Sequence, residues 1–316
     1  MGFIGARCIR YAVSLFFIVI LNFLLPRAMP GDPVMNLIGE DTMVTEATLA
    51  ALRAKLGLDL PIGAQFWSYI SSLCHGDLGY SYHLNGQVLD LLLPRMGWTL
   101  LFTGIAVVAG AAIGLGIGAF AGWRPERTGS RVTSVLSLAI SCTPPYFLAL
   151  LFLSLFSFRL GLFPFKGLYD EPTIGSIAWH LFLPVLVLTL FAASRNILIM
   201  RGSVLQEGGS LYALYARAKG CSDRFVLFGH VLKNASLPLI TQVALDFGFI
   251  FSGALFVEIV FSLNGMGTLI YDAVMGRDYP LLQGALLIIA ITVIAANLAA
   301  DLICARIDPR LREAGR

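Results

Sequence analysis

Charged side chains are scarce in this sequence of 316 residues, since Asp, Glu, Lys and Arg together make up only 13% of it. Soluble domains usually carry about 25% charged residues. With 57% of its residues hydrophobic, the chain has too few polar side chains to cover its surface in water. The composition therefore excludes an ordinary soluble domain and predicts a protein that lies in lipid.

The short motifs of phosphate binding and hydrolysis are also missing. The sequence has no Gly-Lys dipeptide, and therefore no P-loop, and it has neither an HExxH nor a GxSxG motif. Its five cysteines form no CxxC pair and its four histidines form no HxxxH pair, which indicates neither a disulfide framework nor a metal site. We expect no catalytic residue, metal or cofactor in this chain, which disfavours a membrane enzyme.

What the sequence has instead is a series of long apolar stretches. A helix needs about 20 mostly apolar residues to cross the hydrocarbon core of a membrane. Six stretches have this character: 9–29, 97–122, 132–158, 177–200, 236–261 and 281–304. The first could also be a signal peptide; because the later stretches need a membrane in any case, we expect it to be retained. The sequence thus predicts an all-α polytopic membrane protein of about six transmembrane helices.

A polar segment separates the first two apolar stretches. It is too long for a turn, and within it Leu49–Leu56 and Phe66–Leu73 have the pattern of short helices. The predicted organisation is a first transmembrane helix at 1–29, a small folded external cap at 30–95, a five-helix core at 96–305 that includes a cytoplasmic loop at 201–235, and a cytoplasmic tail at 306–316.

The orientation follows from Lys and Arg, which are enriched in cytoplasmic loops. If the N-terminus is cytoplasmic, the loops on that side hold the larger share of these residues, chiefly in Arg124–Arg131, Arg201–Lys233 and Arg306–Arg316. Both termini are therefore predicted to be cytoplasmic.

Glycines recur at four-residue spacing in the second apolar stretch, at Gly110, Gly114, Gly118 and Gly122. On a helix they share one face. A face of this kind lets a second helix approach closely, which is the main packing device in lipid. It predicts a packed helix bundle and does not indicate what the bundle does.

The loop at 201–235 has the pattern of two short helices. Ser210 can cap a helix over Leu211–Lys219 that Gly220 ends, and a second helix can follow Ser222 and run to about Asn234. From the residues alone, a lipid-facing surface patch and a docking surface for a cytoplasmic partner both remain open.

The string Ala216-Arg217-Ala218-Lys219-Gly220, followed at long spacing by Leu237-Pro238, resembles the EAA loop of ABC importer permeases, and in particular that of the peptide/nickel subgroup. Where the wider family has Glu-Ala-Ala, this chain has Leu214, Tyr215 and Ala216, so that only Ala216 and Gly220 match the general pattern. The resemblance implies that Leu214–Gly220, comprising Leu214, Tyr215, Ala216, Arg217, Ala218, Lys219 and Gly220, docks on an ATPase subunit and couples its closure to transport.

Further segments resemble the same subgroup in the same order along the chain. They are Val257–Ser262, Gly265–Leu269, Arg277–Pro280 and, upstream, Pro30–Pro33 and Gly76–Ser81. The upstream pair resembles the subgroup's external-segment signatures, carried by Gly31, Asp32, Gly76, Asp77 and Gly79. One departure is Leu263-Asn264, where the subgroup usually has Trp-Pro, which leaves the turn there open.

The resemblance implies a type I ABC importer permease of the inner membrane that forms half of a path for di- or oligopeptides. Its implied partners are a second homologous permease, two cytoplasmic ATPase subunits that hold ATP and Mg, an external solute-binding protein and membrane lipid, and no nucleic acid. A nickel-chelate or glutathione importer is the alternative within the family. A self-contained secondary transporter, which would show inverted repeats and broken helices, is the alternative outside it.

Ionisable groups inside a membrane are costly and are functional candidates by default. Asp246 and Glu258 lie in the fifth apolar stretch and Arg195 in the fourth, and all three are candidates for the translocation path. For Asp246, a role in the path and a structural pair with Arg195 both remain open. Asp246 and Glu258 are separated by about 18 Å along a helix, so they are not expected to form one site.

Overall fold

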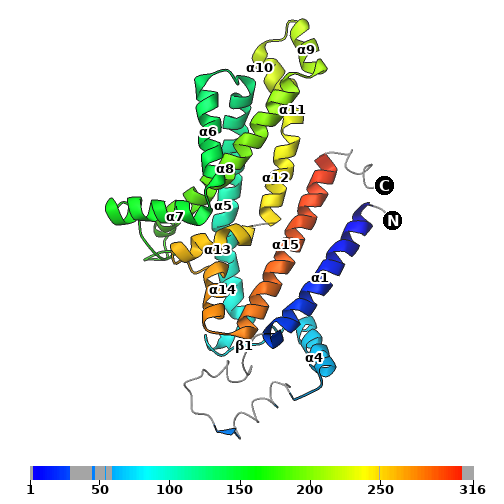
Figure 1. Ribbon diagram of the computed structural model, residues 1–316, viewed down its shortest axis with the longest axis vertical. Helices are drawn as coiled ribbons and strands as arrows, with labels where there is room; N and C mark the ends of the chain where they lie inside the picture. The colour runs from blue at the N-terminus through cyan, green and yellow to red at the C-terminus, as the bar shows by residue number, and fades with distance from the viewer. Residues whose placement is uncertain (1–2, 29–44, 47–53, 55–58, 249, 308–316) are drawn as a thin grey trace. The chain divides into compact units, whose positions relative to one another are not determined.

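The computed structural model describes residues 3–28, 45–46, 54, 59–248 and 250–307. Its regular secondary structure is helical apart from one two-stranded hairpin, β1 (Tyr80–Ser81) with β2 (Gly86–Gln87). Its principal helices follow one another from blue to red in Figure 1: α1 (Phe3–Ala28), α4 (Ile62–Cys74), α5 (Val88–Trp123), α6 (Thr128–Cys142), α7 (Pro145–Phe152), η1 (Leu153–Arg159), α8 (Ile174–Gly208), α9 (Leu211–Ala218), α10 (Asp223–Phe225), η2 (Val226–Val231), α11 (Leu232–Ala235), α12 (Leu237–Gly248), α13 (Ile250–Val260), α14 (Met266–Met275) and α15 (Tyr279–Ile307).

Four helices of the described chain are long and apolar enough to cross a membrane, within Ile9–Arg27, Val88–Trp123, Ile174–Gly208 and Tyr279–Ile303. They coincide with four of the predicted stretches, although two of them are longer than predicted. α5 begins at Val88, so the last residues assigned to the external cap are helical. α8 ends at Gly208, so the first residues assigned to the cytoplasmic loop also belong to a helix.

The third predicted stretch, 132–158, is not one straight helix. α6 and the helix formed by α7 and η1 meet at an angle of 101°. The cause is the pair Pro144-Pro145. A residue before proline is forced out of the helical region, and Thr143 is extended with φ −89° and ψ 127°. With this bent pair counted as one span, the described residues hold up to five spans.

The fifth predicted stretch, 236–261, is covered by α12 and α13. Residue 249, between them in the sequence, lies outside the described residues, as does the predicted helix Leu49–Leu56 except for Ala54. The second short helix predicted in the external segment, Phe66–Leu73, is present within α4.

The chain divides into two compact units. The first contains residues 99–263 and the end of α15 from residue 295. The second contains residues 4–98 together with 264–294. In this grouping, α14 and the first part of α15 belong with α1, α4 and the hairpin. The predicted division into an external cap at 30–95 and a five-helix core at 96–305 stays a prediction.

In the first unit, α8 is the central helix. It packs against α6, α7 and α12, which are visible around it in Figure 1. The glycine face of α5 also lies directly on it. A methyl group added at Gly110 would lie 2.7 Å from the Ala192 Cβ, and one added at Gly118 would lie 2.8 Å from the Ile197 carbonyl oxygen. Since no side chain fits there, the predicted close approach of two helix backbones is confirmed, and we call this contact the α5–α8 seam.

In the second unit, α1 is tied to the start of α15 by reciprocal hydrogen bonds. The Asn22 side-chain amide donates to the Gln283 carbonyl oxygen at 2.8 Å, and the Gln283 side-chain amide donates to the Asn22 carbonyl oxygen at 2.7 Å. Phe23 packs on α4 through Phe66, at 5.1 Å between ring centroids, and through Tyr69 at 5.7 Å. These contacts fix the described part of the external segment against α1.

Candidate functional site

α9 is the short helix that the sequence predicted between Ser210 and Gly220, and its bounds are confirmed to within one residue. Ser210 lies at its N-cap position in an extended conformation, but its side chain does not cap the helix as predicted. The Ser210 hydroxyl instead donates to the Glu207 carbonyl oxygen at 2.6 Å. Gly220 has φ +86°, a left-handed conformation that costs other residues about 1–2 kcal/mol. Glycine at this position therefore ends the helix and allows the chain to turn back towards α10.

The two faces of α9 differ sharply. Ala213 is fully buried and Ala216 is 6% exposed, whereas the outer side carries large apolar side chains: Leu211 is 86%, Leu214 49% and Tyr215 63% exposed. The two alanines pack into a cluster with residues from α8, η2, α11 and α12, which includes Met200, Val204, Val226, Leu227, Val231, Ala235 and Leu239. Small residues thus hold α9 close to the helices beneath it, and its apolar face stays uncovered.

Charged and aromatic groups make contacts at the C-terminal end of α9. The Arg217 guanidinium lies 4.8 Å from the centre of the Trp123 ring, and its Nε lies 3.8 Å from a carboxylate oxygen of Asp223. The Lys219 ammonium lies 4.6 Å from the centre of the Tyr215 ring. The contacts of Arg217 connect α9 to the end of α5 and to α10.

The Tyr212 hydroxyl donates to the Glu207 carboxylate at the end of α8. Burial, together with this hydrogen bond, raises the pKa of the Tyr212 hydroxyl.

The second predicted loop helix is also present. It begins after Ser222, whose hydroxyl accepts a hydrogen bond from the Phe225 backbone N–H at 3.3 Å, and it continues through α10, η2 and α11 to Ala235. Its middle portion is a π-helix, which the sequence did not predict. Val226, Leu227 and Val231 on this segment are buried beneath α9.

Asp246 and Arg195 are in direct contact, as one of the two alternatives for Asp246 requires. One Asp246 carboxylate oxygen accepts hydrogen bonds from Arg195 and, at 2.8 Å, from the Gln242 side-chain amide. The other carboxylate oxygen is buried without a hydrogen-bond partner among the described residues. The Asp246 side chain is 6% exposed and that of Arg195 is 42% exposed, so this ion pair has one open side. Participation of these residues in a translocation path stays a prediction.

Glu258 lies apart from this pair, on α13. It is fully buried, and its carboxylate accepts a hydrogen bond of 2.5 Å from the Thr99 hydroxyl at the N-terminal part of α5. The sequence gave no signal of this burial. Leu263, three residues after the end of α13, is also buried, and its N–H donates to the Glu258 carbonyl oxygen at 2.9 Å.

The external-segment residues Gly76, Asp77 and Gly79 form a tight turn after α4. Gly76 has φ +76° and Gly79 φ +91°, and the Asp77 carboxylate accepts a hydrogen bond from the Gly79 N–H at 2.8 Å. This arrangement explains why glycine and aspartate occur at these positions. Gly31 and Asp32, the other predicted members of this set, lie outside the described residues.

Asp278 was not singled out as a site residue, although it holds the second unit together. It is 2% exposed. One carboxylate oxygen accepts hydrogen bonds from the Ser81 hydroxyl at 2.5 Å and the His83 N–H at 3.2 Å, and the other accepts one from the Leu281 N–H at 3.1 Å. The only signal in the sequence was that Ser81 and Asp278 both lie in family-like segments.

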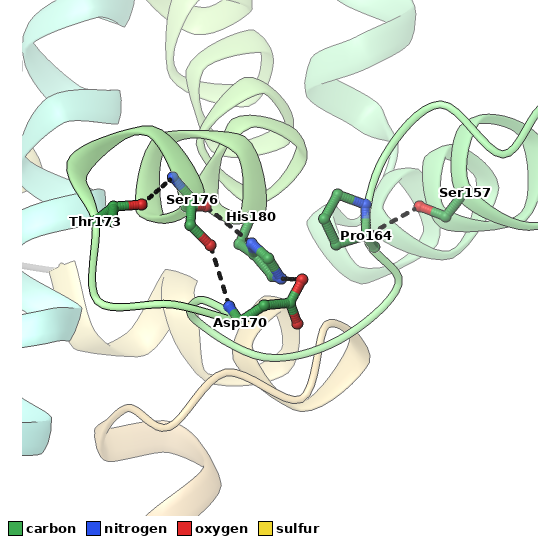
Figure 2. A network of polar contacts seen from close by, with 6 residues as sticks. All are labelled: Ser157, Pro164, Asp170, Thr173, Ser176 and His180. Atoms are coloured by element: carbon green, nitrogen blue, oxygen red, sulfur yellow. Dashed lines mark hydrogen bonds and ion pairs between the residues drawn. The ribbon is translucent and has the colours of Figure 1, made fainter.

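A second unpredicted network lies in the loop that precedes α8 (Figure 2). His180 is buried, and its Nε2 lies 3.6 Å from a carboxylate oxygen of Asp170, whose backbone N–H donates to the Ser176 hydroxyl at 3.1 Å. Thr173 caps α8 by accepting from the Ser176 N–H at 3.3 Å. The loop is fastened to the end of α13 by a hydrogen bond of 3.2 Å from the Gly167 N–H to the Phe261 carbonyl oxygen.

Two family models match this chain and together cover most of it. Residues 114–313 match the model described as binding-protein-dependent transport system inner membrane component. Residues 1–103 match the model of the N-terminal part of such membrane components.

Similar proteins of known designation cover nearly the whole chain. A "putative peptide permease protein" of Brucella ovis is 37% identical over 299 residues, which make up 93% of this chain and 94% of the relative. The glutathione transport system permease protein GsiC of Escherichia coli O6:H1 is 33% identical over 314 residues, 99% of each chain. The protein of the same name from Shigella dysenteriae is 32% identical over the same length.

Proposed function

The chain belongs to the family of binding-protein-dependent transport system inner membrane components and is an ABC importer permease, and from this premise we propose that α9 is the surface on which its ATPase docks. It is a multi-pass inner membrane protein, and its family works with a solute-binding protein and an ATPase. We further propose that both termini are cytoplasmic, which places α9 on the side where ATP is available.

The observation that carries this proposal is the two-faced construction of α9. Large exposed apolar groups are enriched at protein interfaces, and Leu211, Leu214 and Tyr215 form such a group at i, i+3 and i+4 spacing. Arg217 and Lys219 at the end of the helix favour a water-facing protein partner over the lipid interior. A patch that lies flat on lipid is the other use of such a helix, and a pair of leucine substitutions separates the two uses.

In the proposed transport cycle, two copies of the ATPase bind ATP and Mg and dock on this chain and on a second, homologous permease. ATP-driven closure of the ATPases moves α9 and opens the path towards the external solute-binding protein, and hydrolysis resets it. The chain itself contributes no catalytic residue. The Arg195–Asp246 pair, with its open side, and Glu258 are the proposed polar groups of the path.

Di- or oligopeptides are the proposed substrates. The support for this class is the designation of the relatives, one of them a peptide permease and others glutathione permeases. Glutathione, itself a tripeptide, is the alternative cargo within that class, and a nickel chelate is the next alternative.

The test is a matched pair of substitutions, Leu214→Asp and Leu162→Asp. The two leucines are equally exposed, at 49% and 51%, but Leu162 lies in the loop between η1 and α8, at the opposite end of α8 from α9. Each variant is expressed with its genomic neighbours and purified in mild detergent through a tag on this chain. The amount of co-purified ATPase is then measured by quantitative mass spectrometry.

We expect Leu214→Asp to lower the recovered ATPase at least tenfold, since a hot-spot side chain contributes about 2 kcal/mol or more to binding. Leu162→Asp should leave the recovery unchanged. Equal recovery with both variants would contradict the docking role of α9 and would favour a helix that lies on lipid.

A further inference from the structure

A pocket at one end of the first unit has no role in the proposed function. Its volume is about 690 Å³, and it lies between the end of α5, the start of α6, α10 and η2. Its lining consists of an apolar group, a basic group and small polar residues, which include Ile117, Phe120, Trp123, Phe228, Arg124, Arg127, Arg224, Asp223 and Ser130. A pocket of this size is large enough for a small ligand or the headgroup of a lipid.

The charge of the pocket is strongly positive. Arg124, Arg127 and Arg224 line it, and none of the three forms an ion pair within the described part of the chain. The one carboxylate in the lining, Asp223, is already engaged by Arg217 at 3.8 Å. Three arginines thus line the pocket beside one carboxylate that is already engaged, which favours an anionic ligand.

The start of α6 adds to the positive electrostatic potential of the pocket. α6 has 15 residues, and its N-cap residue, Arg127, provides no side-chain hydrogen bond to the first turn. The first backbone N–H groups of a helix have no partner within the helix and carry a partial positive charge. Gly129 and Ser130 of this turn line the pocket, so their side of the helix end faces the ligand.

The apolar part of the lining is exposed and continues the surface of a span. Ile117 is 45%, Phe120 66% and Phe228 61% exposed. Ile117 and Phe120 belong to the last turns of α5, a helix that is long and apolar enough to cross the membrane. With α5 across the membrane, we expect these side chains at the depth of the acyl chains and the arginines directly beyond the span at the depth of the lipid phosphates.

We propose that this pocket binds an anionic phospholipid, such as phosphatidylglycerol, with its phosphate among Arg124, Arg127 and Arg224 and an acyl chain along Phe120 and Phe228. A free phosphate would use the arginines and the start of α6, and would leave the exposed apolar wall without a partner. A zwitterionic lipid would bring a cation into a pocket whose only carboxylate is occupied. The combination of charge and apolar surface therefore selects an anionic amphiphile.

The bound lipid would also contact the elements that position α9. Asp223 and Arg224 are neighbours on α10, and Asp223 contacts Arg217 of α9 while Trp123 lies under the same guanidinium. The proposal does not depend on ATPase docking at α9, because the pocket and the exposed face of α9 are lined by different residues.

Native mass spectrometry of the purified full-length permease, with its co-purifying partners, tests the proposal. Phosphatidylglycerol and phosphatidylcholine of equal chain length are titrated separately in detergent, and bound lipid is counted for each. The variants are Arg124→Gln, Arg127→Gln and Arg224→Gln, singly and combined. Arg131→Gln is the matched control, because Arg131 is paired with Glu126 at 3.1 Å and is not among the lining residues.

We expect phosphatidylglycerol to bind at least tenfold more tightly than phosphatidylcholine. Each pocket variant should weaken phosphatidylglycerol binding about fivefold, the value expected for one basic side chain near a lipid surface, and Arg131→Gln should not weaken it. Should the combined variant fail to fold, as judged by its melting temperature, the single variants decide. Unchanged binding in all of them would overturn the proposal.

A competition with inorganic phosphate separates a lipid headgroup from a free anion. We expect millimolar phosphate to leave bound phosphatidylglycerol in place, since the acyl chain contributes to binding. Displacement of the lipid by phosphate at the concentrations at which phosphate alone binds would show a plain anion site and would overturn the lipid assignment.

Discussion

Helices α5 and α9 have the same two-sided construction, but their outer faces need different partners. Both place small residues on the inner face and large apolar residues on the outer face. In α5 the glycines lie on α8, and Ile113, Ile117 and Phe120 point outward; in α9 the alanines are buried, and Leu211, Leu214 and Tyr215 point outward. The two helices differ in length. The apolar face of α5 extends over many turns, whereas Arg217 and Lys219 end α9 after two turns.

This comparison shows that the length of a helix is needed to decide whether its exposed apolar face lies against lipid or against a partner. A face that runs along a 36-residue helix is more than long enough to cross a bilayer and needs only lipid. The same face on an 8-residue helix cannot span and needs a protein partner or the lipid surface. The small residues on the inner side have the same effect in both regions, which is to bring backbones close together.

The largest effect is expected from filling the seam. In Gly114→Leu the new side chain meets the backbone of Asn196, where even a methyl group would lie 3.1 Å from the carbonyl carbon. The helices must separate, at a cost of about 3 kcal/mol or more, and little folded protein should be recovered. Gly116→Leu is the control, because nothing lies within 4 Å of a methyl group at Gly116. Monodisperse yield in size-exclusion chromatography measures both, and equal yields would contradict the seam.

The next largest effect is expected at the ion pair between Arg195 of α8 and Asp246 of α12. Asp246→Ala leaves Arg195 without its partner, which costs about 3–5 kcal/mol for a fully buried pair and less here, because Arg195 is 42% exposed. The neutral double variant Arg195→Gln/Asp246→Asn should recover much of the loss. Thermal unfolding in detergent measures these effects, with the single variants Arg195→Gln and Asp246→Asn beside the double variant. If the loss in the double variant equals the sum of the two single losses, the two side chains do not stabilise each other.

A smaller effect is expected from substituting two glycines, one after the end of α9 and one within α8. Gly220→Ala should destabilise the end of α9 by about 1–2 kcal/mol, since its φ is +86°. Gly202→Ala, within α8 and with nothing near its Cβ position, should stabilise by about 1 kcal/mol. Hydrogen exchange of the α9 amides and the melting temperature report the two changes. Stabilisation by both substitutions would mean that Gly220 does not need its left-handed conformation.

The smallest effect is the pH dependence of the contact between Tyr212 and Glu207. Because the pKa of Tyr212 is raised in the folded protein, its contribution to stability is complete below the unfolded value of about 10 and is lost as pH rises through the folded value. Tyr212→Phe removes this alkaline loss and, at neutral pH, costs about 1 kcal/mol or less. Melting temperatures from about pH 8 to pH 11 should therefore converge for the two proteins, and parallel curves would contradict the assignment.

Local signals explain which parts of this fold were predictable. Gly220 ends α9 because a left-handed turn depends on a single residue, and the glycine spacing of α5 directly implies a close contact. Ser210 lies at the predicted N-cap position, although its side chain makes no capping hydrogen bond. The bend between α6 and α7 also had a local signal in Pro144-Pro145, which the length of the apolar stretch concealed. Hydropathy counts apolar residues and is insensitive to a change of direction between them.

The buried carboxylates could not be predicted in this way. Glu258 pairs with Thr99 and Asp278 with Ser81, over separations in sequence for which no periodicity exists. A carboxylate near a helix end looks the same in the sequence whether it faces water or a hydroxyl group from a distant helix. The Arg195–Asp246 contact was foreseen only as one of two alternatives, because opposite charges in neighbouring spans restrict the choice of partner.

The close contacts of the seam make α5 and α8 a single rigid pair of helices. Backbone contacts extend from Gly110 to Gly122, about 18 Å along the helix, so neither helix can bend or slide alone without a collision. α8 continues unbroken to Gly208, close to the start of α9 at Leu211. We therefore expect a movement of α9 to be passed to α8 and, through the seam, to α5, with little bending of either helix.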